Sequence, residues 1–415
     1  METVAHFRYS RAATARGTFS LKKTSAGLLL AGLLAAAMPP AFGGAEFKIG
    51  DDAGLTAGIG LRMSYSKMEN GAPNGTSNSN DFNVDNTRLF FTGHYGNIIK
   101  GTFNVDRTGA SSSAAGDGLR VLDAIAQFEF NDVFNIWMGR MLPPQDRANG
   151  YGPFYALPWS YPLVVSNYPQ IENGRDNGVT VWGKPFGGHL VYSVGAFEGH
   201  NKDGAGYSGA SDKLAYSGRL VWHIWDPEPA PAYLAGGWFG GSKDLLSVGL
   251  GAYTQADGVG SAARPGRLRV WNTDVLFEKK FGSFVPTLEG AYYKYKLGAV
   301  DCGSAEPGAP ATPTCLAPAA SARQVMEDGK AYLLSAGVLF TEKFGWGQFQ
   351  PYVRYQKFER TLSNTTNKQT DFGLNYIIKG PNAKVVAQYS KMEDSRRPAP
   401  ANDLWQFVLG VQLVY

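Results

Sequence analysis

Apolar and polar residues alternate with a period of two through much of the chain. In the last stretch, Leu404–Tyr415, Trp405 and Phe407 lie on one side of the pattern, and Gln406 and Gly410 lie on the other. Such alternation predicts strands with one apolar and one polar face, because successive side chains of a strand point to opposite sides of the sheet. A wall between lipid and water needs strands of this kind, although a terminal strand of a soluble sandwich would look the same.

The same pattern predicts sixteen strands between Leu55 and Tyr415. Short turns mostly alternate with longer loops, which is typical of an all-β, transmembrane antiparallel β-barrel. One Pro-rich connection, after Trp225, is too long for its place among the short turns. The predicted strands are Leu55–Ser66, Arg88–Tyr95, Ile98–Asp106, Arg120–Phe130, Phe134–Met141, two flanking Gly187-Gly188, Lys213–Trp225, Leu245–Gln255, Arg269–Lys280, one ending near Lys296, two flanking Phe344–Gly347, two flanking Gly380–Asn382, and the C-terminal strand.

The N-terminal residues have the pattern of a secretory signal peptide. Five basic residues precede the apolar run Ala26–Met38, and Pro and small residues follow it. Cleavage after Ala45 is favoured over cleavage after Gly43, which divides the chain into a signal peptide (1–45) and a barrel (46–415). The whole chain has 39 basic and 35 acidic residues, and the leader holds five and one of them. The mature chain is therefore neutral, so its charge gives no reason to expect nucleic-acid binding.

Composition agrees with a barrel. Aromatic residues make up 13% of the chain, 52 residues are Gly, and the mean hydropathy is −0.22. Outside the leader, no apolar run is long enough for a helical membrane span. Only alternate residues of a barrel strand meet lipid, and sixteen strands enclose an aqueous channel.

The long connection from Leu142 to Arg175 is dense in Tyr, Trp, Phe and Pro. Loops of this length in compact domains are usually functional or disordered, and this composition favours packing. It is predicted to be the third extracellular loop, folded inward to narrow the lumen. The alternative is a loop that contacts a neighbouring subunit or caps the rim. Its predicted constriction residues are Asp146, Arg147, Glu172, Arg175 and Asp176.

Three segments resemble the phosphate-selective porin O and P family of bacterial outer-membrane proteins. They are Gly118-Leu-Arg-Val-Leu-Asp-Ala-Ile-Ala126, Trp137-Met-Gly-Arg-Met-Leu-Pro-Pro144 and Gly174-Arg-Asp-Asn-Gly-Val179. The resemblance implies a sixteen-stranded homotrimeric channel for anions, with phosphate as a solute. Phosphate specificity in that family depends on a denser set of pore arginines and lysines than this chain carries.

Charged residues on the inward side of the alternation give the predicted lumen lining. Closing the barrel places Arg354, Lys384, Arg62, Arg88 and Lys100 along one arc, with most acidic residues off it. A basic wall facing an acidic loop predicts a modest anion preference, whereas the competing interpretation is that the charges only keep the lumen wet. The basic set is Arg62, Arg88, Lys100, Arg219, Arg354 and Lys384, and the acidic set is Asp106, Asp123, Glu129, Asp274, Glu278 and Asp371.

Other chemistry is sparse in the sequence. The histidines after the leader are dispersed, so no catalytic residue, metal site or cofactor is predicted. Cys302 and Cys315 share one predicted extracellular loop, which favours a disulfide in an oxidising compartment. The expected function is therefore a non-enzymatic outer-membrane porin for small ions and solutes. Two alternatives are a barrel scaffold for a periplasmic cytochrome and a barrel hydrolase that uses His94 or His189 with a nearby Ser.

Overall fold

A computed structural model describes most of the chain after the predicted leader. The described residues are 44–107, 118–162, 164–165, 174–199, 212–260, 265–298, 315–316, 325–326, 328–361, 363–399 and 401–415. Residues 1–43, Glu172 and Cys302 fall outside these ranges, so the signal peptide, that loop residue and the Cys302–Cys315 disulfide stay predictions. Within the ranges, no helix combines the length and the apolar character that a membrane-crossing helix requires.

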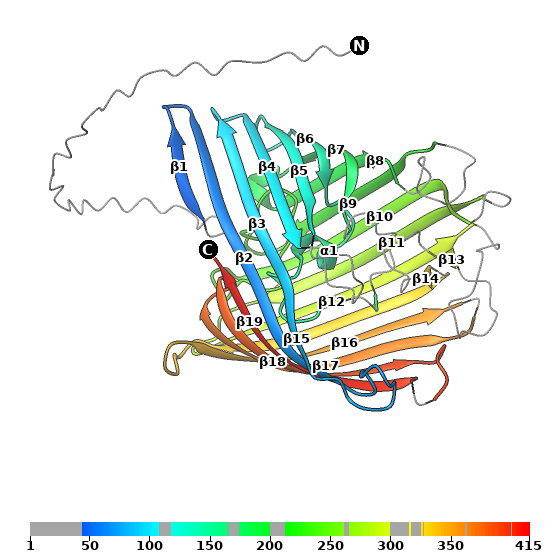
Figure 1. Cartoon of the computed structure of the whole chain (residues 1–415). Helices are drawn as coiled ribbons and strands as arrows, with labels where there is room; N and C mark the ends of the chain where they lie inside the picture. The colour runs from blue at the N-terminus through cyan, green and yellow to red at the C-terminus, as the bar shows by residue number, and fades with distance from the viewer. Residues whose placement is uncertain are drawn as a thin grey trace, which may run out of the picture. The chain divides into compact units, whose positions relative to one another are not determined.

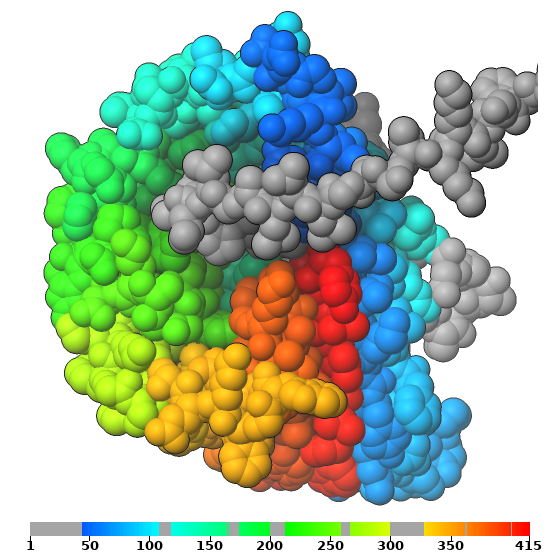
Figure 2. Space-filling view, turned by 90° about the vertical axis from the view of Figure 1, so that its left-hand side faces the viewer, coloured from blue at the N-terminus to red at the C-terminus, as the bar shows by residue number. Residues whose placement is uncertain are grey.

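Sixteen strands pair antiparallel in chain order and close into a ring, as predicted (Figure 1). The last strand closes on the first, with Gln406 opposite Met68 and Val414 opposite Gly60. Figure 2 shows this closure, with the red C-terminal strand lying against the blue N-terminal one. The ring strands are β2 (Ala53–Met68), β3 (Asp81–Tyr95), β4 (Ile99–Arg107), β5 (Leu119–Glu129), β6 (Asn135–Met141), β7 (Asp176–Gly183), β8 (Leu190–Phe197), β9 (Ala215–His223), β10 (Leu245–Gly260), β11 (Pro265–Glu278), β12 (Phe284–Leu297), β15 (Gly329–Phe340), β16 (Gln348–Arg360), β17 (Thr366–Lys379), β18 (Ala383–Asp394) and β19 (Asp403–Val414).

Five short elements were not predicted. β1 (Ala45–Ile49) pairs with the first residues of β2, and β13 (Cys315–Leu316) pairs with β14 (Val325–Met326). The helix α1 (Arg147–Tyr151) lies in the long connection between β6 and β7, and a 3-10 turn, η1 (Phe186–Gly188), lies between β7 and β8. Strand boundaries also moved: β3 begins at Asp81 instead of Arg88, and β11 at Pro265 instead of Arg269.

Burial follows the predicted alternation. On β2, Arg62 and Ser64 are buried, whereas Met63 between them is 46% exposed. On β19, Leu409 and Val411 are exposed beside the buried Gln412. Large exposed aromatics gather near the short connections, including Tyr95, Phe130, Phe281, Phe344 and Trp346. An outward apolar surface with aromatic residues near its edge matches a barrel that meets lipid.

Connections alternate between two ends of the ring. At one end, six of the seven connections have three to seven residues, and we call this the short-connection end. The seventh joins β9 to β10 and runs from 224 to 244, which is the connection identified as too long in the sequence. The long β6–β7 connection begins at the opposite end.

Candidate functional site

The first part of the β6–β7 connection is attached to the inner side of β9 and β11. Ser217 of β9 donates a hydrogen bond to the Pro144 carbonyl, and Asn272 of β11 donates to the Gln145 carbonyl at 3.3 Å. Asp146 caps α1 by accepting the Asn149 backbone N–H at 2.9 Å. This helix therefore starts against the β9–β11 wall.

The second part of the connection is attached to a different sector of the ring. Inward side chains of five strands donate to its backbone carbonyls, so the connection touches both walls. A polar backbone buried away from water needs such partners. The donor–acceptor pairs are Gln412 to Phe154 (2.9 Å), Lys384 to Ala156 (3.1 Å), Asn375 to Leu157 (3.0 Å), Arg62 to Trp159 (2.5 Å) and Arg354 to Ser160 (2.8 Å). We call residues Leu142–Tyr161 the inner segment.

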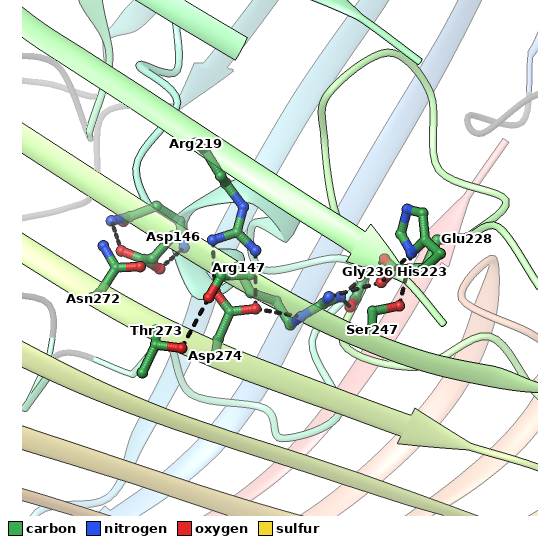
Figure 3. Close-up of polar contacts among 12 residues, drawn as sticks. Asp146, Arg147, Arg219, His223, Glu228, Gly236, Ser247, Asn272, Thr273 and Asp274 are labelled. Atoms are coloured by element: carbon green, nitrogen blue, oxygen red, sulfur yellow. Dashed lines mark hydrogen bonds and ion pairs between the residues drawn. The ribbon is translucent and has the colours of Figure 1, made fainter. Parts of the chain in front are cut away.

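A buried ion network fixes α1. The guanidinium of Arg147 donates to both carboxylate oxygens of Glu228, at 2.9 and 2.7 Å, and to Asp274 at 3.2 Å. Arg219 donates to the two oxygens of the same Asp274, at 2.6 and 2.9 Å. Figure 3 shows Arg147 between Asp274 and Glu228, with Arg219 reaching Asp274 from β9. Two cations and two carboxylates make the network neutral.

Burial shapes the ionisation of the loop members of this network. It would raise the pKa of Glu228, but the charge and hydrogen bonds of Arg147 outweigh it and lower that pKa. Burial would lower the pKa of Arg147, but Glu228 and Asp274 outweigh it and raise that pKa. Burial raises the pKa of the neighbouring Asp146 to about 6, against the hydrogen bonds from Asn149 and the charge of Arg219. Glu228 and Arg147 therefore hold opposite charges at neutral pH.

A cavity of about 390 Å³ lies between the inner segment and the wall of β2, β3 and β19. We call it the vestibule. Its charged lining residues are Arg62, Arg88, Arg175 and Asp85, and its volume is in the range of small-molecule sites. Arg62 stacks on the Trp159 ring, 3.9 Å from its centroid. Three guanidinium groups and one carboxylate therefore face this space.

The other predicted lumen charges are mostly engaged in pairs. The sequence predicted a basic arc with most acidic residues away from it. In the structure, the basic side chains instead lie beside carboxylates or beside carbonyls of the inner segment. The pairs are Arg88–Asp106 (2.9 Å), Lys100–Glu129, Arg175–Asp123 (3.0 Å), Arg219–Asp274 (2.6 Å) and Arg354–Asp371 (2.7 Å). Two of these pairs lie directly opposite each other in register on neighbouring strands, Arg88 with Asp106 and Arg354 with Asp371. The structure thus differs from the expected separation of a basic wall from an acidic loop.

Two predicted acidic residues have backbone partners. Glu278 accepts the N–H groups of Phe239 and Gly241, at 2.9 and 2.7 Å. Asp176, expected in the loop, is the first residue of β7 and accepts the Gly199 N–H at 2.8 Å. The Glu228-containing 224–244 connection is therefore held by Glu278, and the start of the β8–β9 connection is held by Asp176.

A serine, a histidine and a glutamate do meet in the interior, but not as a hydrolase triad. Nδ1 of His223 lies 2.8 Å from the Ser247 hydroxyl and 3.6 Å from Glu228. A triad needs the serine and the acid on different ring nitrogens, whereas both approach Nδ1 here. Both carboxylate oxygens of Glu228 also accept hydrogen bonds from Arg147. Among the described residues, no three His, Cys, Asp or Glu side chains are placed to hold a metal ion.

Inward glycines are the signal that would have located the inner segment in the sequence. A Cβ at Gly60 would lie 2.9 Å from the Phe154 ring, and one at Gly410 would lie 2.8 Å from Trp159. Both positions lie on the polar side of the alternation, where a side chain could otherwise fill the lumen. Their lack of a side chain lets the inner segment approach the wall.

Comparisons with known proteins support the fold. The sequence matches no protein-family model and no curated protein. Among solved structures, the fold is similar to the anion-selective porin from Comamonas acidovorans (12% identity, 88% of this chain and 100% of that one, TM-score 0.56). It is also similar to OmpF of Salmonella typhi in complex with daunomycin (13%, 89% and 100%, 0.57) and to the trimer form of OmpT, an outer-membrane protein of Vibrio cholerae (12%, 88% and 100%, 0.50). The closed barrel and these neighbours are consistent with the bacterial outer membrane.

Proposed function

We propose that this chain is an outer-membrane porin, a water-filled channel through which small hydrophilic solutes and ions diffuse passively. The observation that carries the proposal is a closed sixteen-stranded ring with apolar residues outside and polar residues inside. A ring of this size has room for an aqueous channel, and its backbone groups are satisfied within the ladder. The solved neighbours include an anion-selective porin.

A modest anion preference follows from the vestibule. Arg62, Arg88 and Arg175 line it with Asp85, whereas the carboxylates of Asp106 and Asp123 lie outside its lining. An ion in the vestibule is thus nearer to the three guanidinium groups than to the carboxylates of Asp106 and Asp123, and among the three carboxylates only Asp85 is equally close. Because total charge is balanced, only this local separation favours anions, and salt screens it.

Phosphate, lipid and subunit contacts complete the proposal. Phosphate passes as one anion among others, since two of the three vestibule arginines already pair with carboxylates. The outward apolar belt contacts outer-membrane lipid. A homotrimer is supported by the fold shared with a trimeric outer-membrane protein.

We expect proteoliposomes to take up small organic anions several-fold faster than cations of the same size at low salt. Replacing Arg88 by Gln together with Asp106 by Asn removes one cation from the vestibule and its carboxylate behind it, while amides remain to hydrogen-bond. The anion-to-cation ratio should then fall by about half. Lys357→Gln, on the outward side of β16, is the control and should leave the ratio unchanged. Equal uptake of cations and anions by the wild type would refute the preference, and absence of uptake would refute the channel.

A further inference from the structure

The 224–244 connection is unusually long for the end of the barrel at which it starts. Both of its flanking strands meet it at the short-connection end, where the other connections have three to seven residues. Its base is already closed like a hairpin: the Asp226 N–H donates to the Asp244 carbonyl at 3.0 Å, and the Asp244 N–H donates to the Asp226 side chain at 3.1 Å. The residues between these two aspartates are therefore not needed to join β9 to β10.

Those extra residues are anchored to the wall and to the β7–β8 connection. Glu278 of β11 accepts the Phe239 and Gly241 N–H groups, and Lys184 donates to the Ala230 carbonyl at 2.6 Å. The Trp238 ring is 7% exposed and belongs to one apolar cluster with Leu157 of the inner segment and with residues of β12, β15 and β16. The connection thus packs inside the ring.

The same residues bind the inner segment directly. Besides the Glu228–Arg147 pair, Arg147 donates to the Gly236 carbonyl at 3.1 Å. The Gly237 N–H donates to the Tyr155 carbonyl at 3.2 Å, and the Tyr233 hydroxyl donates to the Leu142 carbonyl at 3.0 Å. Figure 3 shows Glu228 and Gly236 on the side of Arg147 away from Asp274. Two connections that start at opposite ends of the barrel therefore meet in its interior.

We propose that residues Pro227–Lys243 are a second constriction element, which enters from the short-connection end and sets the size limit of the channel together with the inner segment. The inference rests on the proposed channel function. A mostly apolar connection, largely buried or half-buried, that packs against both the wall and the inner segment takes up lumen volume that water and solutes would otherwise occupy. Its two bulkiest buried side chains, Tyr233 and Trp238, anchor it in the apolar clusters of the interior and so hold it in this position.

The test removes the element while keeping the strands joined. Replacing Pro227–Lys243 by Asn-Gly leaves Asp226 and Asp244 flanking a two-residue hairpin turn, which their existing backbone pairing suits. We expect at least about a twofold rise in single-channel conductance, and uptake of neutral sugars that the wild type excludes. Trp238→Ala should change both quantities in the same direction by a smaller amount, and it keeps the test decisive if the shortened chain fails to fold. Shortening the mostly exposed β18–β19 connection is the control and should change neither.

The outcomes separate the two proposals. If the wild type conducts but both the shortened chain and Trp238→Ala keep the wild-type conductance and sugar limit, the second constriction element is refuted and the channel stands. If the wild type itself does not conduct, the channel proposal fails first. A rise in both variants with an unchanged control supports the inference.

Discussion

Replacing Arg147 by Met is expected to detach the inner segment from the wall without opening the barrel. The side chain is 1% exposed and, within the described ranges, it is the one guanidinium or ammonium group that pairs with Glu228. Removing one partner of a buried ion pair costs about 3–5 kcal/mol, because the remaining charge stays buried. Asp274 keeps Arg219, so the loss falls mainly on the contact between Glu228 and α1.

Limited proteolysis and gel mobility measure the two parts of this expectation. The inner segment should become a cleavage site in Arg147→Met, whereas the heat-dependent gel shift of the barrel should stay close to that of the wild type, because the strand ladder closes on itself. Arg147→Met with Glu228→Met should recover much of the protection, since no unpaired charge is then buried. Arg397→Met, at a half-exposed side chain, is the control. Unchanged proteolysis of Arg147→Met would contradict the role given to the network.

Replacing Gly251 by Ala is expected to displace the start of the inner segment. A Cβ at this β10 position would lie 1.9 Å from the Gln145 carbonyl oxygen, which also accepts the hydrogen bond from Asn272. A backbone oxygen cannot move as a flexible side chain can, so overpacking should cost about 1–3 kcal/mol of docking free energy. Conductance noise and proteolysis of the inner segment should both rise.

A glycine on the neighbouring strand supplies the matched comparison. A Cβ at Gly218 of β9 would meet Val194 at 3.4 Å, an ordinary contact outside the interior. Gly218→Ala should therefore behave like the wild type in both measurements. If Gly251→Ala and Gly218→Ala are indistinguishable, the close approach of Gln145 to β10 is not what positions the inner segment.

The fold could be predicted because strand alternation is a local property of the sequence. Each predicted strand corresponds to one strand of the ring, and the inward side of β19 is the buried side, as at Gln412. Boundaries were less predictable, because β3 begins earlier, at Asp81, and its register with β2 shifts between Val84 and Asn86, which interrupts the alternation set by Phe82 and Val84. The short helix α1 gave no periodic signal over its five residues.

Charge pairing could not be predicted, because it depends on register between strands and on contacts between distant segments. Arg88 and Asp106 meet because β3 and β4 pair with that offset, and Arg147 meets Glu228 across 81 positions of sequence. The sequence did mark the 224–244 connection as too long for its place. Its contacts with the inner segment give that length a structural reason, and the inward glycines Gly60 and Gly410 mark the opposite wall.

Recording the wild-type protein in a planar lipid bilayer tests the central claim most directly. We expect discrete conductance steps, and under a tenfold potassium chloride gradient a reversal potential of the sign set by chloride that shrinks toward zero as both sides approach about 1 M salt. Correctly folded, inserted protein that gives no steps would contradict the channel, and a reversal potential of the sign set by potassium would contradict the anion preference assigned to Arg62, Arg88 and Arg175.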